Sequence, residues 1–299
     1  MQFPSYKEGT LIQLGAFFGC DAVDQLKEWR LDKDSHYDQL PVQADDVVFV
    51  NYASSNHFPE ARKGISEIRS RFKHHKIVFY DIGLSPSDRA ELSGVCNLEL
   101  RLFNFSLFPP FVRNLAAYHF KPVIAAEVFS EFKAFWLIDS SIRFKVDPDE
   151  VNNGTYEPYV TGHSSGHSVF AATHSSTYNF LPIDSDLSKS NMMHEATAFI
   201  VHGRRRPFMC SLCALTKECL APSDALLFGH FMKGDSYKTF ANCHRYDQSA
   251  INLVLTSLRE RREDWEQWRT KDRVPFQRLG GPDRGSALPG PLKIQCPTA

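Results

Sequence analysis

Apolar and polar residues alternate in blocks between residues 46 and 144, and these blocks predict strands and helices in regular succession. Runs of β-branched and aromatic residues predict strands over 47–53, 76–81, 98–102 and 134–138. Apolar residues at helical spacing predict helices over 59–72, 86–93, 111–120 and 123–132. Strands that alternate with helices predict an α/β fold, with a mostly parallel sheet flanked by helices.

The pattern changes after residue 151, where Gly, Asn, Ser and His separate short apolar pieces at 168–173 and 197–201. This second half is predicted to be mixed and partly antiparallel, built on the same sheet, with helices over 207–219 and from Asp247 onward. We therefore predict one main domain over residues 46–272. Residues 1–45 are expected to form a loosely packed lead-in with one short helix at 22–29, and the Gly- and Pro-rich residues 273–299 a disordered tail.

The overall charge excludes a general attraction to polyanions. The 34 basic and 35 acidic residues leave a net charge of -1, so no global field favours nucleic acid or an anionic membrane. No apolar run reaches the length of a membrane span, and the first residues are too short and polar a stretch for a signal peptide. We expect either a cytosolic protein or one whose anchor precedes Met1.

Cysteines and glycosylation acceptors bear on the compartment. Four of the seven cysteines cluster in the sequence, at Cys210, Cys213, Cys219 and Cys243. They fit a zinc site only incompletely, so structural cysteines, some of them disulfide-bonded, are the favoured interpretation. Asn104-Phe-Ser106 and Asn153-Gly-Thr155 match the N-glycosylation acceptor. Together these features favour a lumenal protein.

Polar residues stand at the carboxyl ends of three of the predicted strands. Ser54, Asp81 and Asp139 each stand at the carboxyl end of a strand, and those ends converge at one edge of a parallel sheet. Open α/β sheets bind ligands at this edge, and the geometry suits a nucleotide or sugar phosphate. The alternative is that Asp81 and Asp139 are caps or turn formers.

Asp247 and Gln248 open the last predicted helix. Free backbone N–H groups and the helix dipole at such a position favour an anion or sugar hydroxyls. An ordinary Asp N-cap explains the same residues equally well.

Two further patterns bear on a hydrolase nucleophile and on a metal site. Gly162-His-Ser164-Ser-Gly166 matches the G-x-S-x-G elbow of serine hydrolases, although its flanks do not read as a buried strand followed by a helix. His163 and His167 stand four residues apart but complete no four-ligand metal pattern.

Five ordered blocks carry a resemblance to a known family. They are Ser54-Ser-Asn-His-Phe58, Phe79-Tyr-Asp-Ile-Gly-Leu84, Tyr118-His-Phe-Lys-Pro122, Trp136-Leu-Ile-Asp-Ser-Ser-Ile-Arg-Phe144 and Cys243-His-Arg-Tyr-Asp-Gln-Ser-Ala-Ile-Asn252. The chain resembles family 1647 of the domains of unknown function, an animal family, and through it the glycosyltransferases of the GT-A fold, particularly the family 8 type. The resemblance spans roughly residues 46–258.

The resemblance implies roles for individual residues. The donor-binding residues that it implies are Ser54, Asn56, Asp81 and Lys121, with Ser54 and Asn56 by the nucleotide and Asp81 near its base or ribose. Asp247 and Gln248 match the D-Q pair that contacts the transferred sugar or the acceptor, and we expect them to be catalytic.

A divalent cation, Mn²⁺ or Mg²⁺, is implied at Asp139, which matches the first acid of the D-x-D signature. Ser141 replaces the second acid, and no C-terminal H-x-x-G-x-x-K-P-W block follows. Either His163, His167 or His244 completes the site, with His244 our candidate, or metal binding is weak or absent.

We therefore expect a GT-A-like glycosyltransferase that transfers a sugar from a nucleotide-diphosphate sugar to a glycan or protein acceptor, with no nucleic acid partner and no membrane span in this chain. The alternatives are a non-catalytic descendant that binds a glycan or nucleotide sugar, and a serine hydrolase that uses Ser164. The expected location is the Golgi lumen, or the cytoplasm if no anchor precedes Met1. For a lumenal protein, the resemblance also implies a disulfide among Cys210, Cys213, Cys219 and Cys243.

Overall fold

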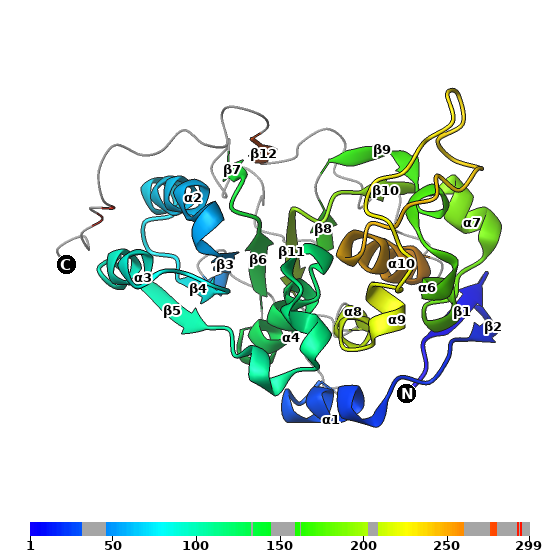
Figure 1. Ribbon diagram of the computed structural model, residues 1–299, viewed down its shortest axis with the longest axis horizontal. Helices are drawn as coiled ribbons and strands as arrows, with labels where there is room; N and C mark the ends of the chain where they lie inside the picture. The colour runs from blue at the N-terminus through cyan, green and yellow to red at the C-terminus, as the bar shows by residue number, and fades with distance from the viewer. Residues whose placement is uncertain are drawn as a thin grey trace.

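A central sheet organises the protein (Figure 1). The computed structural model describes residues 1–31, 46–132, 134–144, 159–161, 163–202, 209–259, 276–279, 292 and 294. Within them, six strands pair in the order β5-β4-β3-β6-β11-β8. They are β3 (Val48–Ala53), β4 (Ile77–Asp81), β5 (Leu98–Leu102), β6 (Ala134–Ile138), β8 (Tyr159–Thr161) and β11 (Ala198–His202). The first four in this order are parallel, and β11 is antiparallel to both its neighbours, which confirms the predicted mixed, mostly parallel α/β sheet.

The strand order reverses between β3 and β6. From β3 the chain steps outward to β4 and β5, and then returns to place β6 on the other side of β3. Asn51 of β3 lies opposite Ile138 of β6, and its side-chain amide donates to the Ile138 carbonyl at 3.2 Å. The next residues, Tyr52 and Asp139, therefore emerge together at the carboxyl edge, where open α/β sheets form their ligand crevice.

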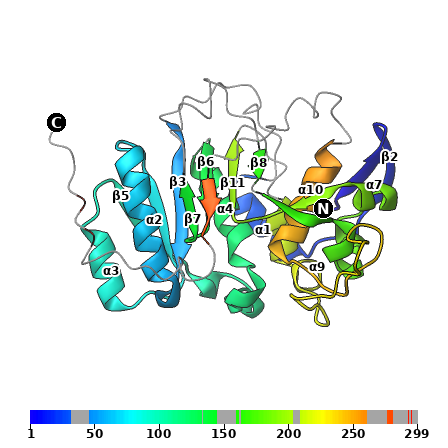
Figure 2. The ribbon, with the colours of Figure 1, turned by 90° about the horizontal axis from the view of Figure 1, so that it is seen from above.

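Helices cover both faces of this sheet (Figures 1 and 2). Trp136 and Ile138 of β6 belong to a core shared with α2 (Phe58–Arg71) and α3 (Pro86–Ser93). Phe135 and Leu137 belong to the larger core on the opposite face. That core includes residues of α1 (Cys20–Glu28), α4 (Phe120–Glu131), α8 (Met209–Ala214), α9 (Lys217–Leu220) and α10 (Asp247–Arg259). A strand with both faces covered must be apolar throughout, which explains the continuous apolar run of β6.

The remaining elements are short. They are β1 (Pro4–Lys7), β2 (Thr10–Leu14), β7 (Ile142–Phe144), β9 (Ser164–Ser168), β10 (Met192–His194), β12 (Phe276–Arg278), α6 (Ser175–Phe180), α7 (Ser185–Ser190) and the 3₁₀ turns η3 (Ser55–His57), η4 (Phe105–Leu107), η5 (Pro110–Arg113), η6 (Leu115–Ala117) and η7 (Phe170–Ala172). The predicted helix at 111–120 is wrong, because Asn114 leaves helical geometry between η5 and η6. No helix in the described ranges has the length and apolarity needed to cross a membrane.

The expected loose lead-in and disordered tail both need correction where they are described. The short helix forms as α1, but Phe3 and Leu26 are buried in the larger core, so parts of residues 1–31 pack against the main domain. Near the other end, β12 pairs with β7 and buries Phe276 completely. Residues 32–45 and most of 280–299 lie outside the described residues, as do Asn153 and its acceptor motif.

A disulfide joins α8 to α9. Cys213 and Cys219 are bonded, which confirms the predicted disulfide within the cysteine cluster and removes the C-x-x-C pair from any zinc site. Cys96 is disulfide-bonded as well, whereas Cys20, Cys210 and Cys243 are free thiols.

Alkylation should separate these cysteines by accessibility. Cys20 is exposed and should react in the native protein, while the buried Cys210 and Cys243 should react only after denaturation without reductant. Peptide mass spectrometry should find Cys213 and Cys219 linked. If all seven thiols react in protein from its native compartment, both the disulfides and a lumenal location are excluded.

The Cys213–Cys219 disulfide closes a short loop. Opening that loop with Cys213→Ser should lower the free energy of unfolding by about 2 kcal/mol.

Candidate functional site

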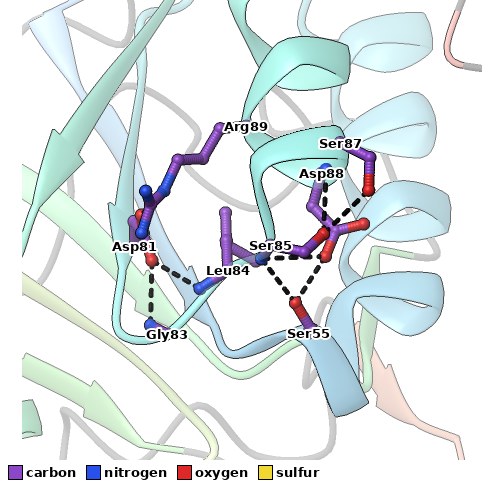
Figure 3. A network of polar contacts seen from close by, with 8 residues as sticks. All are labelled: Ser55, Asp81, Gly83, Leu84, Ser85, Ser87, Asp88 and Arg89. Carbon is purple, nitrogen blue, oxygen red and sulfur yellow. Dashed lines mark hydrogen bonds and ion pairs between the residues drawn. The ribbon is translucent and has the colours of Figure 1, made fainter.

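Asp81 ends β4, and its carboxylate is hydrogen-bonded within the turn that follows (Figure 3). Its Oδ1 accepts the N–H groups of Gly83 at 2.8 Å and Leu84 at 2.6 Å, and its Oδ2 contacts the Arg89 guanidinium. Both oxygens of this buried carboxylate are therefore engaged within the turn. This arrangement favours the turn-former interpretation of Asp81, and its contact with a donor nucleotide stays a prediction.

Ser55 and its neighbours form the rest of this network (Figure 3). The Ser55 hydroxyl donates to Asp88 at 2.5 Å and accepts the Ser85 N–H at 2.7 Å, next to the capping box with which Ser85 and Asp88 begin α3. Ser54 donates to the Asn56 side chain at 2.5 Å. The network joins the ends of β3 and β4, and the donor-binding roles of Ser54 and Asn56 remain predictions.

A buried charge cluster lies at the neighbouring switch point. The Lys121 ammonium lies 3.0 Å from Asp139 Oδ1 and 3.3 Å from Asp247 Oδ2. The Tyr52 hydroxyl donates to the same Asp139 oxygen. Lys121 and Asp247 are buried, and the Asp139 side chain keeps 23% of its surface exposed. The structure thus brings together residues from the first turn of α4, the end of β6 and the start of α10.

The ends of two helices position these side chains. Lys121 occupies the first turn of α4, where the helix dipole disfavours a cation, so its position depends on the two carboxylates. Asp247 begins α10, where the dipole favours an anion. Tyr118 and Tyr246, which precede these helices, have left-handed φ values of 55° and 43°. Such conformations cost bulky residues roughly 1–3 kcal/mol and concentrate at functional sites.

Burial and mutual charge shift the pKa values of the cluster. Burial lowers the pKa of Lys121, but Asp139 and Asp247 outweigh it and hold that pKa well above its usual value. Burial raises the pKa of the Asp247 carboxyl to about 6, with Lys121 opposing the shift and Asp139 adding to it. Burial and the Asp139 charge also raise the pKa of Tyr52. At neutral pH Lys121 therefore carries its positive charge and Asp247 is ionised.

A pocket of about 320 Å³ opens onto the cluster. Its polar lining residues are Tyr118, Lys121, Asp139, Ser165, His167, Glu195, Thr197, Arg245, Asp247, Gln248 and Arg278, and its apolar ones are Ala196, Leu227 and Phe228. Gln248 donates to the Ser165 hydroxyl at 2.7 Å, and Arg278 pairs with Glu195 at 3.3 Å. Asp247 Oδ2 and Arg245 Nε are buried without a hydrogen bond among the described residues.

The pocket contains four of the eight predicted site residues, namely Lys121, Asp139, Asp247 and Gln248. Arg245 and Tyr118 were not predicted as site residues, although both lie inside sequence blocks that carry the resemblance. Tyr52 reads as a core residue of a strand, and no pattern in the sequence marks Glu195, Phe228 or Arg278.

The donor set does not fit a divalent cation. Lys121 already occupies the space between the two carboxylates, and Ser141 is buried. Across the described ranges, no group of three or more His, Cys, Asp or Glu side chains is arranged to hold a metal ion. We therefore derive no chemical step through a metal.

The candidate histidines are placed differently from one another. His244 is buried outside the pocket: its Nδ1 accepts the His174 N–H at 3.2 Å, and its Nε2 donates to the Leu220 carbonyl at 2.8 Å. Burial lowers the pKa of His244 to about 4, so it stays neutral with both nitrogens engaged. His167 lines the pocket but stacks on Phe231, while His163 is exposed at the start of β9. The structure does not bring His244 to Asp139.

Ser164 does not form a nucleophile elbow. It begins β9, which pairs antiparallel with β10, and the chain continues as a strand through Ser168. A strand–turn–helix elbow is needed to present a hydrolase nucleophile. The hydrolase alternative is therefore wrong on its geometry.

Removing the ammonium should destabilise the fold. Lys121→Met leaves two carboxylates facing each other near a buried helix start, and the expected loss of unfolding free energy is about 3–5 kcal/mol. Lys27→Met is the matched control, because Lys27 pairs with Asp24 on the exposed surface of α1. That change should cost less than about 1 kcal/mol. Urea denaturation measures both, and equal effects would contradict the dependence on Lys121.

Asp247 should impose a pH dependence on stability. Its pKa rises from an ordinary 3.8 to about 6 on folding, so the folded state binds more protons between these values. The parent should lose about 3 kcal/mol of unfolding free energy relative to Asp247→Asn between pH 3 and pH 7, and almost no more above that range. Urea titrations of both proteins test this, and a difference that does not change with pH would refute it.

A search of curated proteins finds no match. Among solved structures, the galactosyltransferase LgtC in complex with donor and acceptor sugar analogues is 12% identical, with 70% of each chain covered and a TM-score of 0.43. The bifunctional glycosyltransferase WbbM is 15% identical, with 72% of this chain and 38% of that chain covered and a TM-score of 0.43. Similarity this low says nothing of activity.

A family match covers the first part of the chain. Residues 5–126 match the family described as "Protein of unknown function (DUF1647)". The match includes β1, β2 and α1, and it ends within α4. The predicted resemblance to family 1647 is therefore confirmed, over these residues.

Proposed function

We propose that this pocket binds a nucleotide-diphosphate sugar and transfers its sugar to an acceptor. The observation that carries the proposal is a pocket at the sheet's switch point that opens onto the buried Lys121 cluster and leaves Arg245 Nε without a hydrogen bond among the described residues. Buried polar groups are almost always satisfied, so this atom calls for a polar ligand. The five blocks that resemble GT-A glycosyltransferases support the same conclusion.

The pocket supplies the charges that such a reaction needs. Negative charge develops on the diphosphate as it leaves, and fixed cationic groups stabilise that charge most in a partly dehydrated site. Arg245 and Arg278 line the pocket beside Lys121 and are suited to this task. Asp247 and Gln248 offer carboxylate and amide groups to sugar hydroxyls. In this proposal side chains take the part that the resemblance assigns to Mn²⁺ or Mg²⁺ at Asp139.

A non-catalytic binder is the second candidate. The ion pairs satisfy Lys121 from both sides, so the cluster stands without any reaction to perform. Such a protein would bind a nucleotide sugar or glycan in this pocket without turnover. Assays of donor hydrolysis and transfer with a panel of nucleotide sugars distinguish it from the enzyme.

The Golgi lumen remains the proposed location. The Cys213–Cys219 disulfide suits an oxidising compartment. Asn104 of the first acceptor motif is exposed at the start of η4, where glycosylation machinery can reach it.

Nucleotide binding tests the proposal. Calorimetric titration of UDP and GDP should show binding to the parent in the presence of a chelator. Arg245→Gln should weaken it about ten-fold, equivalent to 1.4 kcal/mol. Asp139→Asn removes a negative charge beside the ligand and should leave binding unchanged or stronger. Asp24→Asn, on exposed α1, is the matched charge control.

The opposite outcomes are equally informative. If Mn²⁺ is required and Asp139→Asn weakens binding ten-fold or more, the cation implied by the resemblance is present. Binding of neither UDP nor GDP, with or without Mn²⁺, would overturn the proposed donor.

A further inference from the structure

Phe228 is exposed at the mouth of the pocket. Its side chain retains 77% of its accessible surface, yet it lines the pocket together with Leu227. It belongs to the segment between α9 and α10, which runs past α10 (Figure 1). Burying a phenylalanine side chain is favourable, so a ligand that covers the ring gains free energy from this contact.

The backbone on both sides of Phe228 is held in place. The His230 N–H donates to the Ala241 carbonyl at 2.9 Å, and the His244 N–H donates to the Leu226 carbonyl at 2.6 Å. The chain around Ala241 is also held in place, because the Ala241 N–H donates to the Ala171 carbonyl at 2.8 Å. Phe228 is thus fixed at the pocket mouth although its ring is exposed.

Gly229 makes this position possible. A Cβ atom at residue 229 would lie 2.7 Å from the Cys243 sulfur and nearer still to the Ala241 carbonyl oxygen. The segment can approach Cys243 so closely only because residue 229 has no side chain. The close approach fixes the backbone next to Phe228, which lines the pocket.

The residues that line the pocket together with Phe228 suit an amphipathic ligand. Phe228 and Leu227 form the apolar part of the lining, and Gln248, Ser165 and Arg245 form a polar part. A pyranose ring has this same division, with an apolar C–H face and hydroxyls around its edge. The electron-rich face of an aromatic ring attracts the partly positive C–H groups.

The other exposed apolar residues near Phe228 lie outside the pocket lining. Leu226 and Met232 are 57% and 62% exposed, but neither lines the pocket. The apolar contribution inside the pocket comes from Phe228, Leu227 and the small Ala196, beside many polar groups. This composition suits a saccharide better than an alkyl chain.

We infer that Phe228 is a stacking platform for a pyranose ring of the acceptor saccharide, with Gln248 and Ser165 placed to bind its hydroxyls. The assignment to the acceptor rests on the proposed function. Stacking of a saccharide on Phe228 does not, and it is tested without any donor.

The test is saturation-transfer difference NMR with methyl glycosides of galactose, glucose, mannose and N-acetylglucosamine. At least one should bind the parent, with the strongest transfer to protons on one face of its ring. Phe228→Ala should weaken that binding ten-fold or more, and Phe228→Trp should retain it. Leu226→Ala is the control, since this neighbour is exposed and outside the pocket lining, and it should bind as the parent does. Thermal denaturation verifies that each variant is folded.

Three outcomes would overturn the inference: no glycoside binds, Phe228→Ala binds as well as the parent, or cyclohexanol competes as effectively as the glycosides. The nucleotide titrations separate this failure from that of the proposed function. If glycosides bind in a way that depends on Phe228 but UDP and GDP do not bind, the stacking inference is supported and the proposed nucleotide-sugar donor is overturned. Nucleotide binding without glycoside binding does the reverse.

Discussion

The structure depends on the pairing of one buried ammonium with two carboxylates. Removing Lys121 from water costs several kcal/mol, and its place at a helix N-terminus adds to that cost. Asp139 and Asp247, held at 3.0 and 3.3 Å, offset it, and the Tyr118 ring lies 4.7 Å from the ammonium. These residues come from α4, from the end of β6 and from the start of α10, so the pairing fixes the position of three elements around one pocket.

Periodicity predicted the elements whose burial is one-sided or complete. The strands β3, β4 and β6 and the helices α2 and α10 fall close to their predicted ranges, since each buries a long apolar face. Hydrophobic periodicity did not predict elements that form without burying a regular apolar face. All five residues of β2 are exposed, and backbone pairing with β1 alone makes it a strand. The three residues of β12 are too few to show any period, although Phe276 is buried completely.

Position along the elements, rather than residue type, identified the useful part of the site. Asp139 and Asp247 were found because one follows a buried strand and the other begins a helix. Asp81 satisfies the same rule, yet two backbone amides and Arg89 engage its carboxylate. A sequence cannot distinguish these cases, because the difference lies in whether local donors reach the oxygens. Tyr52 was missed since an aromatic residue in a strand is usually core, and only the register with β6 sets its hydroxyl against Asp139.

The distance in sequence between the members of the charge cluster has a consequence for the order of folding. Lys121 and Asp139 are close in the chain, and α4 and β6 can form their pair early. Asp247 follows more than a hundred residues later, after β11, α8 and α9. Because contacts between distant residues form slowly, and the amino-terminal part of a chain is synthesised first, a partly folded molecule holds a Lys121–Asp139 pair with an open side. Docking of α10 closes it, so the pocket exists only in chains that have completed this last step.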